Sequence, residues 1–439
     1  MRVLIIGGGP SGLKCAFNLL QLGHEVFIFE REPVLGGLAR SFELHGTKIE
    51  RYYHFICMGD TGLINMIREL GLDSQLRWKY TRMGVWRDGK LYPFTSVLDV
   101  LRFPPLPPVE RLKYLWAAFR ASLRKDWSDL ENVPAVDWLR QEFGLIAYEV
   151  IWKPLMQRKF GPYTERVSAA WIWARIKRLA DSRTRFLKRE RLGYLLGGSE
   201  TLIGKLAEQV AAMGGHIYTK AQVDRILIKN RRAYGLYVDG SEVLGDAIIS
   251  TVPLPHLIRL LPEEAEPYQK HLMQTKYLGI VCVVLRMTER LSPYFWINVS
   301  GDDIPFPGII EYTNLNPRPD IGGSILYIPN YLPREHPYFT MDDEVILRLH
   351  LDMLDKMFPH FKREAVTDAF VFRETFAQPV CEIGFTQMMV AQKSPIQGLF
   401  VTENSQLHPH DRTISQTFDL ADKVTQLMEI EVQSLQPLR

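Results

Sequence analysis

The chain has 439 residues, of which 46% are hydrophobic, 23% charged and 11% aromatic, a composition typical of folded globular proteins. This length supports a large core and favours two domains, and no apolar run reaches the roughly 18 residues of a transmembrane helix. The net charge is only +3 and no recognition motif accompanies the basic residues, so a nucleic-acid-binding protein is disfavoured.

The first thirty residues contain two short apolar runs separated by a glycine turn and a helical pattern. The periodicity predicts a buried strand over 3–6, a helix over 11–22 and a second buried strand over 26–29. The turn between the first strand and the helix reads G-x-G-x-x-G. This order is typical of a βαβ unit that binds a dinucleotide. It also shows that the first apolar run is a strand and not a signal peptide, so we expect a cytoplasmic protein.

Each glycine of the turn has a steric role in this interpretation. Gly7 permits the tight turn, Gly9 allows a pyrophosphate to approach the backbone, and Gly12 allows the helix to pack closely on the strand. The free N–H groups at the start of this helix, which begins around Pro10 and Ser11, would face the diphosphate. We therefore predict that these five positions contact the cofactor.

The residues after the second strand favour a flavin dinucleotide over a nicotinamide dinucleotide. Glu30 follows the last glycine by 18 residues and can accept hydrogen bonds from a ribose hydroxyl pair, with Arg31 beside it. A second glycine pair ends at Gly37 and precedes Leu38 and Arg40. It predicts a second close approach of the backbone to the same extended cofactor, which nicotinamide enzymes do not need.

These features resemble the superfamily of FAD enzymes that includes amine oxidases, protoporphyrinogen oxidases and phytoene desaturases, with the protoporphyrinogen-oxidase-like branch the nearest in pattern. Later segments are similar to those of the same superfamily: a glycine pair before a helix at 196–202, a strand over 219–227, a strand ending in T-x-P over 246–253, and G-L-F-x-x-E at 398–403. The resemblance implies non-covalent FAD, because the cysteine motif of covalent flavin attachment is absent. It also implies cofactor contacts at Val223, Thr251 and Glu403.

The C-terminal region departs from this superfamily. The usual glycine-rich helix after Glu403 is replaced by N-S-Q-L-H-P-H-D-R-T-I-S-Q. A helix over 413–428 is still predicted, and its N-terminus would point at the flavin and stabilise the anionic reduced form. We therefore expect contacts from Arg412, Thr413 and Ile414. The alternative for Asp411–Arg412 is a helix-capping aspartate followed by a surface arginine.

The flavin segments are separated along the chain, so the fold class predicted is α/β, with a Rossmann-like FAD domain of the glutathione-reductase and amine-oxidase type built from discontinuous pieces. Its predicted pieces are 1–80, 190–260 and 385–439. The insertions 81–189 and 261–384 would form a substrate domain of mixed sheet and helical cap. Its predicted strands lie over 279–285, 323–328 and 372–379, and a helix over 342–357.

The first insertion is rich in basic residues. Residues 153–191 contain twelve Lys and Arg residues and three acids, which suits an anionic substrate, an acidic membrane surface or a solvated helix face. A further amphipathic helix is predicted over 110–125, with an apolar stripe of Leu112, Leu115, Trp116, Phe119 and Leu123. This stripe either packs in the core or dips into the inner membrane surface as a peripheral contact. The sequence gives no oligomeric state.

Catalysis by a flavin needs no visible catalytic pair, because the cofactor performs the difficult step. No cluster has metal-ligand spacing, and His54 in R-Y-Y-H-F is the one weak catalytic candidate. This loop and the later G-K-L-Y-P-F are similar to UDP-galactopyranose mutases, which use the same fold without net redox.

We expect an FAD-dependent oxidoreductase acting on a small-molecule substrate that is large and partly apolar, by hydride transfer to flavin N5. The alternatives are a mutase-like isomerase of a sugar nucleotide or glycan precursor, and a flavin-binding protein without turnover.

Overall fold

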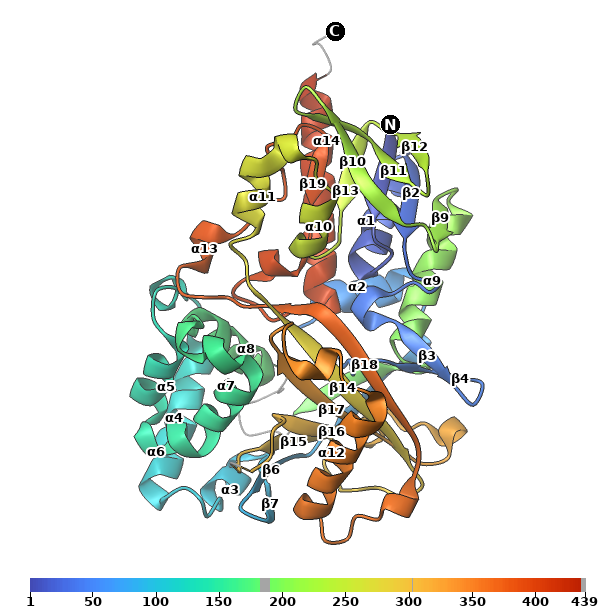
Figure 1. Cartoon of the computed structure of the whole chain (residues 1–439). Helices are drawn as coiled ribbons and strands as arrows, with labels where there is room; N and C mark the ends of the chain where they lie inside the picture. The colour runs from blue at the N-terminus through green and yellow to red at the C-terminus, as the bar shows by residue number, and fades with distance from the viewer. Residues whose placement is uncertain (182–189, 302, 436–439) are drawn as a thin grey trace.

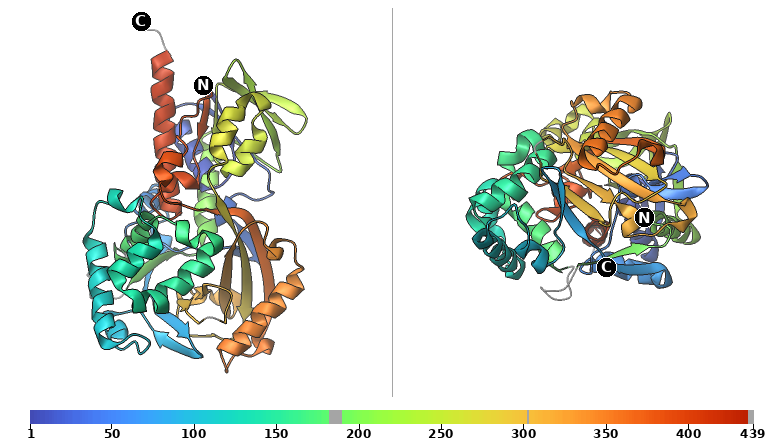
Figure 2. Two further views of the ribbon diagram at one scale, coloured as in Figure 1. Left: turned by 60° about the vertical axis from the view of Figure 1, so that its left-hand side comes forward. Right: turned by 90° about the horizontal axis from the view of Figure 1, so that it is seen from below.

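The structure is a computed structural model, and it describes residues 1–181, 190–301 and 303–435 (Figure 1). Both termini lie at one end of the molecule, and a large sheet flanked by helices lies at the other end (Figures 1 and 2). Along the described ranges, no helix combines the length and the apolar character needed to cross a membrane.

A five-stranded parallel sheet forms the end that carries the N-terminus. Its strands, in spatial order, are β19 (Leu399–Val401), β13 (Ala247–Ser250), β1 (Arg2–Ile6), β2 (Glu25–Glu30) and β9 (His216–Thr219). All four pairings are parallel, so the carboxyl ends of these strands lie along one edge, where ligands of open α/β sheets bind. The predicted α/β class is confirmed.

Both faces of this sheet are buried. Successive residues of β1 point to opposite sides, and both sets pack in a core. Val3 and Ile5 pack with the helices α1 (Pro10–Gln21), α9 (Ser199–Ala212) and α14 (Ile414–Leu435). Leu4 and Ile6 pack on the other side, where α10 (Leu254–Leu260) and a three-stranded sheet lie. That sheet consists of β10 (Val223–Lys229), β11 (Arg232–Val238) and β12 (Ser241–Leu244).

The prediction of one strand over 219–227 is wrong in its extent. β9 ends at Thr219, and β10 begins at Val223 in a different sheet. Between them Lys220 has a φ of 56° and donates its N–H to the Glu32 carbonyl, so the chain turns here. Apolar alternation continues through the turn, which is why the sequence alone did not separate the two strands.

A seven-stranded sheet forms the opposite end of the molecule. Its order is β18 (Val366–Pro379), β14 (Tyr277–Met287), β17 (Ser324–Leu332), β16 (Gly308–Glu311), β15 (Trp296–Val299), β6 (Met83–Arg87) and β7 (Lys90–Pro93). Its pairings are antiparallel except for that of β15 with β6. α12 (Asp343–Met357) covers one face, and Ile346 and Leu354 lie in the core beneath it.

A group of helices lies beside this sheet, on the side away from α12 (Figure 2). It comprises α3 (Val97–Leu101), α4 (Pro108–Leu123), α5 (Ala135–Phe143), α6 (Leu145–Ala147), α7 (Lys153–Phe160) and α8 (Ala169–Asp181). Two strand pairs, β3 (Ser41–Leu44) with β4 (Thr47–Glu50) and β5 (Leu76–Tyr80) with β8 (Arg191–Leu195), and the helices α2 (Thr61–Glu69), α11 (Glu266–Leu272) and α13 (Phe385–Met388) complete the main elements. The domain boundaries drawn from the sequence stay a prediction.

The helix α4 presents its large apolar side chains to solvent. Leu112, Trp116 and Leu123 are between 60% and 62% exposed, so the prediction that they pack in the core is wrong. The buried residues of α4 are Ala117 and Ala121. Their small side chains allow close packing, and the Ala121 carbonyl accepts a hydrogen bond from the Trp173 indole of α8 at 3.0 Å. Leu115 and Phe119 are half-buried.

Candidate functional site

A cavity of about 550 Å³ extends from the glycine turn after β1 to the seven-stranded sheet and the helices α7 and α8. With the exception of Gly12, every residue predicted to contact the cofactor lines it. These are Gly7, Gly9, Pro10, Ser11, Glu30, Arg31, Gly37, Leu38, Arg40, Val223, Thr251, Glu403, Arg412, Thr413 and Ile414. Tertiary structure therefore brings together residues that are spread over the whole sequence, although their contact with the cofactor itself stays a prediction.

The glycine turn leaves room for a ligand only because side chains are missing from it. Gly7 has a φ of 107°, and a Cβ on Gly12 would lie 2.0 Å from the Gly7 carbonyl oxygen. A Cβ on Gly37 would lie 3.3 Å from the Gly9 Cα, so the two glycine loops meet here. Among the described residues no side chain caps the start of α1, and none bonds the buried Ser11 hydroxyl. This set of free donors suits a diphosphate.

Glu30 is held in place by the backbone around it. Its two carboxylate oxygens accept the N–H groups of Gly8 at 2.8 Å and Glu32 at 2.9 Å. Each oxygen retains a second lone pair, so the carboxylate can still accept from a ribose hydroxyl. Arg31 beside it is a more exposed side chain, 3.5 Å from Glu32.

Two further predicted contacts are fixed by hydrogen bonds at the sheet edge. The Thr251 hydroxyl donates to the Ile6 carbonyl at 2.9 Å, which joins the ends of β13 and β1. Glu403 accepts the Tyr277 hydroxyl at 2.9 Å and the Ser405 N–H at 2.9 Å. Burial raises the pKa of the Glu403 carboxyl above its usual range, although the Ser405 and Tyr277 hydrogen bonds oppose this.

Arg40 lies at the junction of the second glycine loop and the seven-stranded sheet. Its guanidinium is 3.8 Å from Glu32 and 3.9 Å from Glu374, and its buried Nε has no hydrogen-bond partner within the described part of the chain. Together with the glycine loops and Glu30, this unpaired donor fits an extended dinucleotide such as FAD.

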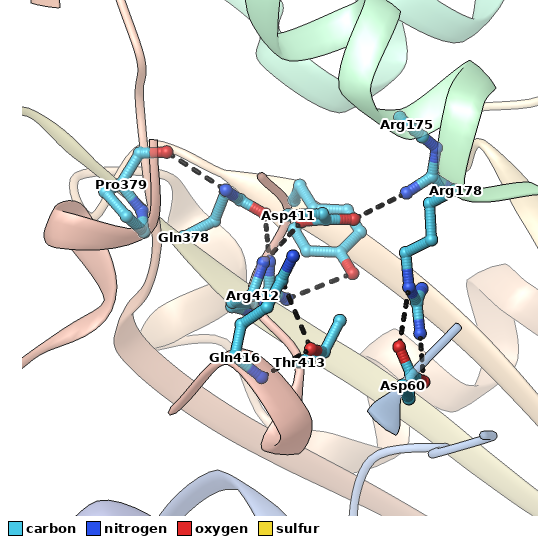
Figure 3. A network of polar contacts seen from close by, with 10 residues as sticks. Asp60, Arg175, Arg178, Gln378, Pro379, Asp411, Arg412, Thr413 and Gln416 are labelled. Carbon is cyan, nitrogen blue, oxygen red and sulfur yellow. Dashed lines mark hydrogen bonds and ion pairs between the residues drawn. The ribbon is translucent and has the colours of Figure 1, made fainter. Parts of the chain in front are cut away.

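The segment before α14 is part of the cavity wall, so the alternative of a capping aspartate and a surface arginine is wrong. Thr413 caps the helix, because its hydroxyl accepts the Gln416 N–H at 3.1 Å. Arg412 bonds the Gln378 side chain and the Tyr331 hydroxyl, the latter at 3.3 Å (Figure 3). Asp411 accepts from Arg175 of α8 at 2.7 Å.

Sequence reasoning did not place the basic side chains of α7 and α8 in the site. Lys159, Arg175 and Arg178 line the cavity, and Arg178 bonds Asp60 at 2.9 Å and 3.4 Å (Figure 3). Arg175 and Arg178 are three residues apart, so they lie on one face of a helix. This spacing is the sequence feature that could have predicted that both point into the site. Four other basic residues of the run, Arg183, Arg185, Lys188 and Arg189, lie outside the described residues.

The loop after β4 supplies part of the aromatic wall of the cavity. Tyr53 lies 5.2 Å from Trp296 and 6.0 Å from Tyr327, measured between ring centroids. His54 also lines the cavity, and its buried Nδ1 has no partner in the described ranges. Burial lowers the pKa of His54. A neutral imidazole can accept a proton, but a catalytic role for His54 stays a prediction.

A model of the family "Flavin containing amine oxidoreductase" matches residues 10–413. The chain belongs to this family. It is an FAD-dependent oxidoreductase, as the sequence predicted, and the cavity described above fits this cofactor. Membership also explains why the matching segments are spread over the whole chain.

Similar proteins span the whole length of the chain. The 15-cis-phytoene desaturase of Synechococcus elongatus is 22% identical over 441 aligned positions, which cover 92% of this chain and 90% of the desaturase. An oxidoreductase structure from Methanosarcina mazei has a TM-score of 0.73 and 20% identity, covering 98% of this chain and 100% of that one. The structure of reduced UDP-galactopyranose mutase has a TM-score of 0.73 and 16% identity, with coverages of 98% and 94%. At such identities the two structures share the fold alone.

Proposed function

We propose that this enzyme dehydrogenates or oxidises a large, partly apolar small molecule. The observation that carries this proposal is the continuity of the cavity. One space joins the glycine loops at the parallel sheet with a wall of aromatic side chains at the seven-stranded sheet, including Tyr53, Trp296 and Tyr331. A substrate that lies against these rings would share the cavity with a cofactor held by the glycine loops.

FAD, when bound, would supply the two-electron oxidant for removal of a hydride equivalent and a proton from the substrate. The chain's own residues would bind the cofactor and orient the substrate. The glycine loops and the start of α1 would hold the diphosphate, Glu30 would hold a ribose, and the aromatic wall would exclude water from the substrate. His54 lies in the cavity wall, where a ring nitrogen could serve as a proton acceptor.

The relatives support an oxidoreductase with an apolar substrate. Phytoene desaturase is named for a dehydrogenation of a long hydrocarbon, and its similarity extends over nearly the whole chain. The resemblance to the mutase is one of fold alone, so it gives no support to mutase chemistry. We therefore favour net oxidation over isomerisation.

Anaerobic mixing of the oxidised holoenzyme with candidate substrates tests this function. A substrate should bleach the oxidised flavin band without added reductant, and oxygen or a quinone should restore it. Product formation that starts only after reduction with dithionite, and consumes no reductant, would contradict the proposal and favour an isomerase.

We also propose that the exposed face of α4 contacts a lipid surface. Val109, Leu112, Trp116 and Leu123 lie on one side of this helix, each between 60% and 62% exposed. Two neighbouring cations are already paired: Lys113 lies 2.8 Å from Glu110 and Arg120 lies 3.3 Å from Glu142. Attachment by this face therefore depends on the apolar side chains more than on charge.

A further inference from the structure

The ammonium group of Lys159 is a buried cation without a counterion of its own. Lys159 lies in the last turn of α7 and is 8% exposed. Within the described ranges its Nζ forms no ion pair and no hydrogen bond, and its close contacts are with aromatic rings. A lone charge in such a place is costly, so natural proteins usually pair or neutralise it.

Aromatic rings surround part of this amine. Its Nζ lies 4.6 Å from the ring centroid of Trp171, 5.0 Å from that of Tyr331 and 5.8 Å from that of Phe160. Such contacts return only part of the hydration energy of an ammonium group. Because Lys159 also lines the cavity, its open side is directed at the ligand space.

The charges around Lys159 add to the positive potential. Arg175 and Arg178 are paired with Asp411 and Asp60, respectively. Arg412 is held by the neutral groups of Gln378 and Tyr331 (Figure 3). Lys159 and Arg412 therefore carry charges that this cluster does not balance.

The pKa values agree with an excess of cations. Burial would raise the pKa of Asp411, but Lys159, Arg175 and Arg412 hold it well below its usual range. Burial lowers the pKa of Lys159 to about 7, with Arg175 and Arg412 acting in the same direction and Asp411 opposing them. An anion placed here would favour the charged lysine.

We propose that the substrate carries an anionic group, a carboxylate or a phosphate, and that Lys159, together with Arg175 and Arg412, binds it in the cavity. This inference rests on the proposed function, since it adds a polar head to the apolar molecule that lies against the aromatic wall. Lys159 is here a binding residue, which positions the substrate by its charged end.

Binding to the oxidised holoenzyme tests the inference without turnover. The probes are dodecanoate, dodecyl phosphate and, as an uncharged control, dodecanol, each titrated below its micelle concentration by calorimetry. We expect at least one anion to bind about tenfold more tightly than dodecanol, which corresponds to ~1.4 kcal/mol. The tighter of the two anions identifies the head group. Equal affinities for all three would overturn the proposal.

The variant Lys159→Met should abolish this preference and leave dodecanol binding unchanged. Lys153→Met is the matched control, because Lys153 lies at the start of the same helix and pairs with Glu149 at 2.6 Å on the surface. Lys159→Arg should keep the preference, because it keeps the charge. Unaltered anion binding in Lys159→Met would overturn the proposal.

The pH dependence gives a second test that needs no loss of the side chain. The titratable and charged groups around Lys159 are Asp411, whose pKa is lowered, Cys381 and Arg412, whose pKa values are raised, and Arg175 and Tyr331. Dodecanoate affinity should therefore fall above pH 7 by up to about tenfold per unit, as Lys159 loses its proton. Lys159→Arg should remove this slope, and a wild-type affinity independent of pH would contradict the inference.

The two proposals can fail separately. If uncharged chains bleach the flavin and anions gain nothing in affinity, the anionic site is wrong and the oxidoreductase function stands. If anions bind through Lys159 but no molecule of this class bleaches the flavin, the site stands and the substrate proposal is wrong.

Discussion

The N–H of Gly8 donates to the Glu30 carboxylate at 2.8 Å and ties the first glycine loop to the end of β2. One side chain thereby supports the loop and faces the predicted ribose position. We expect Glu30→Ala to weaken FAD binding by about 1–3 kcal/mol, because two N–H groups and a ribose hydroxyl pair lose their acceptor. Quenching of FAD fluorescence on addition to the apoprotein measures this loss.

Glu25→Ala is the matched control for this experiment, because Glu25 is an exposed carboxylate at the start of the same strand. Its FAD affinity should equal that of the wild type. Equal affinities for Glu30→Ala and Glu25→Ala would show that Glu30 does not contact the cofactor.

Gly12→Ala should prevent normal packing of α1 against the turn. The new Cβ would lie 2.0 Å from the Gly7 carbonyl oxygen, and a backbone atom cannot move aside as a flexible side chain can. We expect a loss of about 1–3 kcal/mol in the free energy of unfolding, together with weaker FAD binding.

Gly204→Ala in α9 is the control. Apart from the backbone of its own helix, no atom among the described residues lies within 4 Å of the new Cβ, so this variant should be more stable by about 0.5–1 kcal/mol. Urea unfolding of both variants measures the difference, and equal losses would contradict the steric argument.

The first thirty residues could be predicted correctly because their signals are local. Apolar runs, a glycine turn and one acid determine a strand, a helix and a strand without reference to the rest of the chain. Glu403 and Thr251 were placed by the resemblance, since only tertiary structure brings β19 and β13 beside β1. The parallel sheet that joins them is made of segments almost 400 residues apart.

Other features could not be predicted because periodicity gives a face of a helix but not what lies opposite it. The stripe of α4 has the spacing of a core helix, yet Ala117 and Ala121 form the buried side and Trp116 faces solvent. Lys159 and Arg175 belong to different helices, and their basic run is equally typical of a solvated surface. Their presence in one cavity wall follows from the packing of α7 and α8 beside the seven-stranded sheet.

Lys159 should also have a measurable stability cost. Its pKa is lowered from that of an ordinary lysine to about 7, so the unfolded chain binds more protons than the folded chain above that pH. Wild-type stability should therefore rise with pH between 7 and 9, by up to ~1.4 kcal/mol per unit. Lys159→Met should lack this contribution and be the more stable protein at pH 7.

Urea unfolding at several pH values, in parallel for the wild type and Lys159→Met, measures this effect. Taking the difference between the two proteins removes the contributions of all other titrating groups. A difference that does not change with pH would mean that the lysine is not buried as a titrating cation.

Membrane contact through α4 makes a prediction about apolar side chains rather than charges. Leu112→Ser with Trp116→Ser should weaken binding to lipid vesicles by at least about tenfold, because two side chains that would enter the bilayer surface are removed. The free energy of unfolding should change little, since both side chains are exposed. Co-sedimentation with phosphatidylcholine vesicles, with and without phosphatidylglycerol, measures the binding.

Leu244→Ser is the control, because Leu244 is an equally apolar side chain, 55% exposed on β12 at the other end of the molecule. We expect wild-type binding to persist at high salt and with either lipid, because Lys113 and Arg120 are already paired with acids. Binding that needs phosphatidylglycerol and disappears in salt, or that survives the double substitution, would place the membrane contact on another surface.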